Sequence, residues 1–201
     1  MTAILDAARA LHIVHDDDAI DLRAAEAAIH DLLDALGHDP AAEHLRDTPR
    51  RVAAAYAELL TPRSFALTTF PNEEGYDELV LARDIPFVSL CEHHLLPFIG
   101  VAHVGYLPGD RILGLSKLAR VVELFSRGLQ VQERLTKQVA DWLAEHLHPR
   151  GVGVVVKGEH SCMSLRGVRA AGTTTVTSAL HGLLRDDSRS RSEFFALTRT
   201  D

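Results

Sequence analysis

The chain has 201 residues, of which 46% are hydrophobic and 24% charged, a composition typical of a globular protein with a complete core. Its formal net charge of −7 argues against general nucleic-acid binding, because phosphate backbones bind basic surfaces. No apolar run approaches the ~20 residues of a membrane helix, and no basic segment precedes the weakly apolar N-terminus, so we expect no membrane anchor and no signal peptide. We therefore expect a cytoplasmic protein whose two cysteines stay reduced.

The first part of the chain is predicted to be helical. Apolar residues recur at helical spacing from Ile20 to Leu36, and Gly37 follows where a helix-ending glycine belongs. A second helix is expected to begin at Thr48-Pro49 and to continue to about residue 60. We assign residues 1–46 to an N-terminal helical region and residues 47–201 to a second domain, which carries the motifs below.

The second domain is predicted to alternate pairs of strands with helices. Strands are expected over 79–90, with an interruption at Ile85-Pro86, and over 95–107, followed by helices from Ser116 to about 128 and from about 131 to 148. β-branched residues predict strands over 152–157 and 173–180, and Ser190-x-x-Glu193 predicts a capped C-terminal helix. Because consecutive strands favour hairpins, we expect an α+β fold with an antiparallel four-stranded sheet, whose open edges favour oligomerisation.

Each of the two cysteines lies close to histidine. Cys91 and His94 have the three-residue spacing of metal ligands, and Cys162 follows His94 by 68 residues (162 − 94). Two thiolates and one imidazole suit zinc and leave a fourth position for water, although cobalt or iron would also bind. The alternatives are two buried apolar cysteines or a disulfide, and the disulfide needs an oxidising compartment. The neighbouring His93 and His160 favour metal chemistry, because they can carry protons near pH 7.

Basic residues lie close in sequence to the metal motifs. Lys117 and Arg120 share the first turn of the helix that begins at Ser116, a position suited to anions, and Arg166 follows the second cysteine by four residues. Each alone is most simply a solvated surface cation, but together they point to a phosphorylated substrate. Glu133, in the first turn of the next helix, suits the helix dipole, and its carboxylate can also accept two hydrogen bonds from guanine.

Four segments resemble GTP cyclohydrolase I. They read SLCEHH (89–94), GLSKLAR (114–120), QVQERLT (130–136) and HSCMSLRGVR (160–169). The resemblance runs from about Thr48 to the C-terminus, and residues 1–46 carry no such motif. It implies the T-fold, assembled as a toroidal homodecamer whose sites lie between subunits, so a monomer is expected to be inactive.

The resemblance also implies a role for each motif residue. It implies zinc held by Cys91, His94 and Cys162, with His93 and His160 as the proton-transfer pair. The residues implied to contact the ribose triphosphate are Ser116, Lys117, Arg120, Arg166 and, from a looser motif, Arg51. Ser116 is also implied to move protons. Glu133, with Gln132 beside it, is implied to contact the guanine. The implied reaction converts GTP and water into 7,8-dihydroneopterin triphosphate and formate, the first step of tetrahydrofolate and pterin biosynthesis. It proceeds by opening of the imidazole ring, loss of C8 as formate, Amadori rearrangement and ring closure.

Two other classes of function stay open. A T-fold relative acting on another pterin or deazapurine, such as a nitrile reductase, would need a nucleophilic cysteine, whereas here Cys91 and Cys162 match the metal-ligand pattern. A non-enzymatic zinc- or nucleotide-binding module would not need His93 and His160, and both are present. A metal assay separates the first alternative from the main interpretation, and a turnover assay separates the second.

Overall fold

The computed structural model describes residues 20–199, which form two compact units that divide between Thr61 and Pro62. Residues 1–19 of the expected N-terminal region lie outside the described residues. The expected domain boundary lay between residues 46 and 47, whereas the compact units place the helix that begins at Thr48 with the helix before it. Within residues 20–199, no helix is long and apolar enough to cross a membrane.

The N-terminal unit is a pair of helices, α1 (Leu22–Ala35) and α2 (Thr48–Leu60). The Asp21 carboxylate caps α1 by accepting backbone hydrogen bonds from the first turn. Gly37 ends the helix in a left-handed conformation with φ +82°, as its position in the sequence predicts. No residue within α1 is fully buried, and Ile29 and Leu33 of its apolar stripe are half-buried. Helix α2 follows Asp47 without a side-chain cap.

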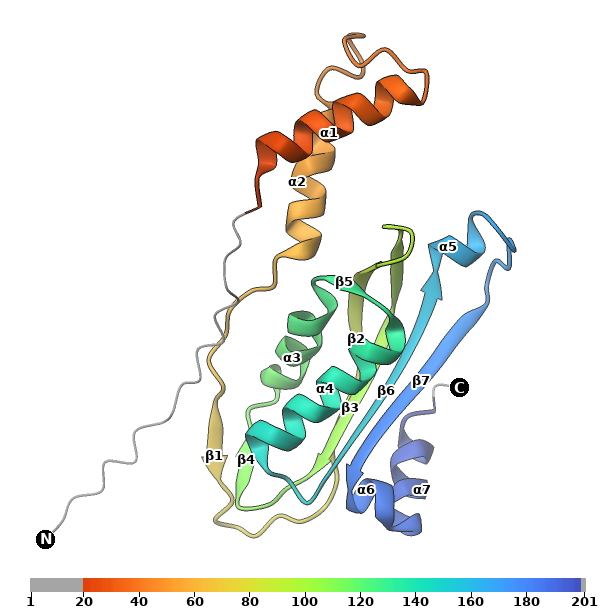
Figure 1. The fold of residues 1–201 in the computed structure, drawn as a ribbon. Helices are drawn as coiled ribbons and strands as arrows, with labels where there is room; N and C mark the ends of the chain where they lie inside the picture. Colours follow the sequence, from red (N-terminus) through yellow and green to blue (C-terminus); the bar gives the residue numbers. More distant parts are fainter. Residues whose placement is uncertain (1–19, 200–201) are drawn as a thin grey trace, which may run out of the picture. The chain divides into compact units, whose positions relative to one another are not determined.

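The second unit combines a twisted sheet with helices on both faces (Figure 1). In chain order its elements are β1 (Thr69–Pro71), β2 (Val80–Cys91), β3 (Pro97–Leu107), β4 (Arg111–Leu113), α3 (Ser116–Ser126), β5 (Leu129–Gln130), α4 (Gln132–Leu147), β6 (Gly151–His160), α5 (Ser161–Ser164), β7 (Thr174–Gly182), α6 (Leu183–Asp186) and α7 (Ser188–Leu197). Strands β1 and β4 form a separate antiparallel ribbon. The α+β class expected from the sequence is therefore confirmed.

The sheet has the order β5-β2-β3-β6-β7. Its four long strands are antiparallel, as predicted, and the two-residue β5 adds a short parallel pairing beside the end of β2. The expected interruption at Ile85-Pro86 is instead a bulge between Ala82 and Ile85, with Asp84 at φ +55°. Pro86 stays within the strand, paired with Val101, because β2 is an edge strand at that point.

Alternation along the strands gives the sheet two apolar faces. Val152, Val154 and Val156 of β6 belong to the main core beneath α3 and α4. On the opposite face, Val155 packs with Phe194 of α7 in a smaller cluster. The cap of α7 differs from the prediction. Its N-cap is Asp187, and Ser190 lies inside the helix and donates to the Asp187 carboxylate from both its N–H and its hydroxyl, each at 2.8 Å.

Candidate functional site

The predicted metal ligands come together at one end of the sheet. Strand β3 lies between β2 and β6, and its residue Phe98 pairs with Ser89 on one side and His160 on the other. The register therefore brings the end of β2, with Cys91, close to the start of α5, with Cys162. The thiols of Cys91 and Cys162 and a ring nitrogen of His94 lie within 4.8 Å of one another.

A tight turn after β2 presents His94 to the two thiols. The Leu95 N–H donates to the Cys91 carbonyl at 2.8 Å, and the Cys91 N–H donates to the Leu96 carbonyl at 2.9 Å. Leu95 accordingly adopts a left-handed conformation with φ +55°. This closed loop places the His94 Nδ1 atom 3.8 Å from the Cys91 sulfur.

The donor set fits a divalent metal ion. Burial raises the pKa of the Cys162 thiol, and the adjacent Cys91 raises it further, because two neighbouring thiolates repel each other. A bound cation would remove that penalty by neutralising both thiolates. Zinc bonds to sulfur at about 2.3 Å and to histidine nitrogen at about 2.0 Å, so one ion needs ligand atoms only a few ångströms apart, as they are here.

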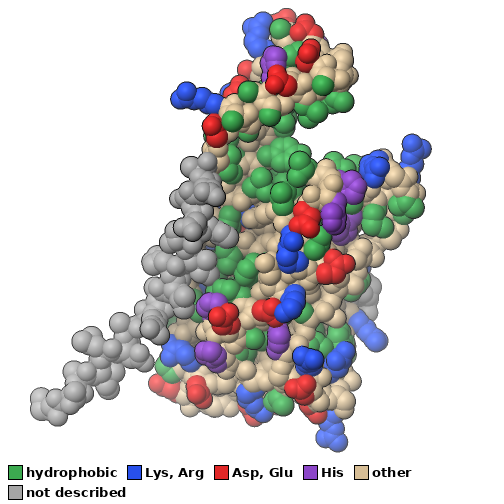
Figure 2. Space-filling view, viewed as in Figure 1, with side chains coloured by type: hydrophobic (Ala, Val, Ile, Leu, Met, Phe, Trp, Pro, Cys, Tyr) green, Lys and Arg blue, Asp and Glu red, His purple; other side chains and the backbone are tan. Residues whose placement is uncertain are grey.

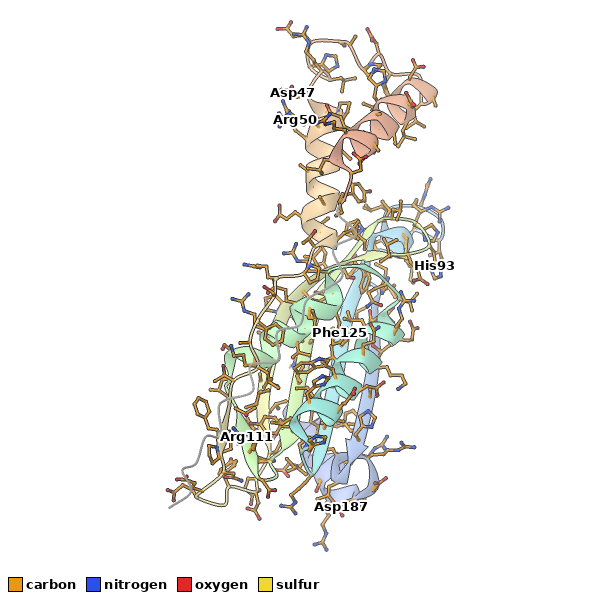
Figure 3. The ribbon with its side chains drawn as sticks, turned by 60° about the vertical axis from the view of Figure 1, so that its left-hand side comes forward. Asp47, Arg50, His93, Arg111, Phe125 and Asp187 are labelled. Atoms are coloured by element: carbon orange, nitrogen blue, oxygen red, sulfur yellow. The ribbon has the colours of Figure 1, made fainter. Side chains whose placement is uncertain are left out.

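Two further histidines flank the three ligands but differ in environment. The His93 side chain is 64% exposed, its Nδ1 atom lies 3.8 Å from the Cys91 sulfur, and Figure 3 labels it at this end of the sheet. Histidine side chains also gather on the surface in this region (Figure 2). His160 is more enclosed, since its ring stacks on Phe98 with centroids 4.6 Å apart. Burial lowers the pKa of His160, and the Glu133 carboxylate partly offsets that shift.

The two residues predicted to read guanine point in different directions from the first turn of α4. Glu133 is exposed and lines a cavity of about 420 Å³ between α4 and β7, shared with Lys137 and His181. Gln132 is only 1% exposed, and both ends of its amide are hydrogen-bonded inside the protein. Within one chain, therefore, Glu133 is open to a ligand and Gln132 is not.

The predicted phosphate-binding residues of α3 begin at the opposite end of the sheet. Ser116 follows β4 closely, and the Leu113 N–H of β4 donates to the Tyr106 hydroxyl at 2.9 Å. Tyr106 lies eight residues along β3 from Phe98, which is roughly 27 Å at the usual rise per residue. In Figure 3, His93 and Arg111 of β4 lie at opposite ends of this unit.

The other predicted cations are placed as follows. Arg120 pairs with Glu123 at 3.0 Å, and Glu123 also binds Arg63 at 2.5 Å. Arg166 is exposed in the loop after α5, close in sequence to the metal ligands. Arg51 belongs to the N-terminal unit, where it pairs with Asp47 at 3.0 Å. The described part of one chain thus brings Arg166, but not Ser116 or Lys117, to the metal end of the sheet.

Two contacts at the metal end were not expected from the sequence. One is the stacking of Phe98 on His160. The other is an ion pair between Glu92, in the tight turn after β2, and Arg134 of α4. Arg134 also donates to the Leu129 carbonyl at 2.7 Å. The residues of each pair are far apart in sequence, so neither pair shows as a local pattern, and only the strand register brings them together.

Comparisons with known proteins identify relatives that match most of the chain. The family model described as GTP cyclohydrolase I matches residues 25–199, an earlier start than the motifs indicated. Proteins named GTP cyclohydrolase 1 are similar to the chain. They include those from Aquifex aeolicus (49% identity over 90% of this chain and 98% of that protein) and Streptomyces avermitilis (54%, 88% and 90%). One from a Synechococcus strain is 52% identical over 88% of this chain and 79% of its own length. A solved structure, archaeosine synthase QueF-Like in the apo form, is similar at a TM-score of 0.42 and 19% identity, over 52% of this chain and 93% of that one.

Proposed function

The chain belongs to the GTP cyclohydrolase I family and is an enzyme of that type, and we propose that it converts GTP and water into 7,8-dihydroneopterin triphosphate and formate. The observation that carries this proposal is the cluster of Cys91, His94 and Cys162 with His93 and His160 on either side. It joins a site for a Lewis-acidic metal to two groups that can move protons near neutral pH. This product would supply tetrahydrofolate and pterin biosynthesis.

The metal we propose is zinc, held by Cys91, His94 and Cys162. When bound with three protein ligands, zinc supplies a coordinated water whose pKa is lowered toward ~7. The chain's own contribution is to hold the ligands at a strand end, in the turn that follows it and in a short helix, and to place two imidazoles beside them. The closeness of the three ligand atoms, all within 4.8 Å of one another, supports this proposal.

We assign proton transfer to His93 and His160. His160, stacked on Phe98 and held by Gln132, is fixed in position and suits proton exchange with the guanine imidazole ring. His93 is mostly exposed, so it can exchange protons with solvent and serve the release of formate. Ring opening and formate release each consume one water, and ring closure returns one, so the overall reaction uses a single water. The Amadori rearrangement follows formate release and precedes ring closure. It needs a proton donor at the ribose, the role proposed for Ser116.

The substrate is recognised at both of its ends. The exposed Glu133 carboxylate can accept hydrogen bonds from the ring N–H and the amino group of guanine, a pair that adenine lacks. Lys117, Arg120 and Arg166 are the proposed triphosphate contacts, because guanidinium and ammonium groups complement phosphate charge. Arg51 is a further proposed phosphate contact.

We propose that each complete site combines residues of two or more copies of this chain. In one chain, Ser116 and Lys117 lie near the end of β3 that is opposite to Phe98 and the metal ligands. One nucleotide is too short to contact the α3 residues and the metal ligands together. A symmetric oligomer would bring the cations of one copy to the metal end of another. The expected assembly is a homodecamer.

The first test is incubation of the zinc-loaded protein with GTP. Formate is measured directly, and neopterin fluorescence is measured after oxidation and dephosphorylation. Both products are expected. Formate without neopterin would retain the hydrolytic part of the proposal and reject the rearrangement, whereas the absence of both in protein shown to hold zinc would reject the function.

A further inference from the structure

The buried amide of Gln132 has only one orientation that satisfies its neighbours. Its Nε2 atom lies 3.1 Å from the Val156 carbonyl and 3.0 Å from the Thr175 carbonyl. A carbonyl oxygen only accepts hydrogen bonds, so the atom that faces two of them must be the NH₂ group. The amide oxygen is therefore the atom that faces His160, at 2.9 Å from its Nε2. At 1% exposure, water cannot substitute for any of these partners.

Neighbouring hydroxyl groups support the same orientation. Thr136 donates to the backbone carbonyl of Gln132 at 2.7 Å, so its oxygen is left to accept from Thr177 at 2.6 Å. The Thr177 oxygen, having donated its own proton, accepts from the Gln132 amide at 3.1 Å. The hydrogen bonds thus run in one direction around the network, and reversing the amide would leave its oxygen facing other acceptors.

This orientation determines which nitrogen of His160 carries the proton. An amide oxygen can only accept, so His160 Nε2 must donate to it. In a neutral imidazole one nitrogen is protonated and the other is not, which leaves Nδ1 with the lone pair. Among the described residues, Gln132 is the one hydrogen-bond partner found for the His160 ring, which also stacks on Phe98.

We propose that Gln132 is a positioning residue, which fixes His160 as the Nε2–H tautomer and so makes Nδ1 the atom that exchanges protons with the substrate. The inference rests on the proposed function only in taking His160 as a proton-transfer group. It gives Gln132 a different role from direct contact with guanine, because both ends of its amide are used within the protein. Glu133, its exposed neighbour, is then the residue of this pair that meets the base.

The first experiment determines the tautomer of the unmodified, zinc-loaded protein. Long-range proton–nitrogen correlation spectra of protein labelled with ¹⁵N-histidine distinguish protonated from unprotonated ring nitrogens. They are recorded at about pH 8.5, two units above the ordinary histidine pKa. His160 is assigned among the 12 histidines by comparison with His160→Asn. We expect a protonated Nε2 and an unprotonated Nδ1. A protonated Nδ1 in the neutral ring would overturn the proposal, and this result does not depend on turnover.

The second experiment replaces the amide. Gln132→Met keeps the length and burial of the side chain but removes its acceptor, so His160 is expected to populate both tautomers. The kcat for GTP should fall roughly 10- to 100-fold, the usual cost of losing an orienting partner, while KM stays within about twofold because no substrate contact is lost. The matched control is Gln130→Met. Gln130 is also buried (6% exposed) and hydrogen-bonded, to the Phe125 carbonyl, Gln138 and Arg134, but it is not hydrogen-bonded to His160.

The outcomes separate the possible roles of Gln132. A raised KM with unchanged kcat would show that it contacts substrate, and an unchanged tautomer with equal losses in both variants would show that it is only structural; either result would overturn the proposal. If Gln132→Met does not fold, as circular dichroism would show, the spectra of the unmodified protein still decide. Absence of formate and neopterin in the unmodified protein would reject the proposed function and leave the tautomer measurement valid.

Discussion

The two ends of the sheet differ in what a single chain completes. At one end, the register of β2, β3 and β6 gathers Cys91, His94 and Cys162 within 4.8 Å. At the other end, Ser116 and Lys117 follow β4, whose Leu113 binds Tyr106, and the one candidate metal cluster found within residues 20–199 is not there. One end holds three residues that could bind a metal ion, whereas the other end, in our proposal, completes a site only with another copy of the chain. Metal binding should therefore be a property of the folded chain, and turnover a property of the assembly.

The strongest test of this contrast removes a ligand from the complete end. Cys162→Ala leaves one thiol and one imidazole, too few to hold zinc firmly. We expect loss of stoichiometric metal and a fall in formate release of at least roughly 1,000-fold, because the coordinated water is lost. Metal content by mass spectrometry and formate assays check both effects. Met163→Leu, in the same short helix α5, should keep its metal, and a Cys162→Ala protein that binds zinc normally would disprove the ligand assignment.

A mixing experiment tests whether the two ends act across copies. Lys117→Ala and Cys162→Ala proteins are each expected to be nearly inactive. When they are unfolded together and reassembled in equal amounts, about one site in four should combine an intact metal end with an intact Lys117 from another copy. Activity should then recover to roughly a quarter of the unmodified level.

The control for mixing pairs two defects at the same end. Cys162→Ala with His94→Ala should not recover, because every metal site in the mixture carries one of the two substitutions. Failure of the Lys117 and Cys162 variants to recover, in oligomers shown to contain both chains, would mean that each site is built within one copy.

A smaller effect is expected at the base-reading position. Glu133→Gln replaces one carboxylate oxygen by an amide donor, so guanine loses an acceptor for one of its two N–H groups. We expect kcat/KM for GTP to fall about 100-fold and the preference for GTP over ITP, which lacks the amino group, to shrink. Steady-state kinetics with both nucleotides measure this. Glu145→Gln, at an exposed position on the same helix, should change neither value. Equal losses for GTP and ITP would argue against base reading at Glu133.

The sequence predicts the long elements well because each carries its own periodic signal. At Gln132 the same periodic signal also predicts burial of the side chain. It belongs to the buried face of α4 with Leu135, Thr136 and Val139, at the i, i+3, i+4 and i+7 spacing of one helix side. The burial of Gln132 was therefore predictable, although the implied contact with guanine, next to Glu133, requires an exposed side chain. Its bond to His160 was not predictable, because it depends on the packing of α4 against β6 and β7.

Caps and site geometry illustrate two different limits of sequence reasoning. At α7, Asp187 and Ser190 are both good capping residues, and the sequence alone favours the box that begins at Ser190. In the structure the N-cap is Asp187, whose carboxylate accepts two hydrogen bonds from Ser190. For the metal site, the spacing of Cys91 and His94 indicates a ligand pair. Their approach to Cys162, in contrast, depends on a register between strands far apart in sequence, which no local pattern encodes.

The smallest predicted effect separates stability at the far end from metal binding. Hydrogen bonds from Ser190 lower the pKa of Asp187, so this carboxylate stabilises the folded state above its unfolded pKa, and the contribution is lost as pH falls through its lower, folded pKa. Asp187→Ala should therefore lower Tm by a few degrees at pH 7, with the difference shrinking in acid. Asp186→Asn, one residue earlier, is the control. Because α7 packs on the cluster of Leu107 and Val155, zinc content should not change, and a parallel loss of metal would show that the two ends of the sheet are not independent.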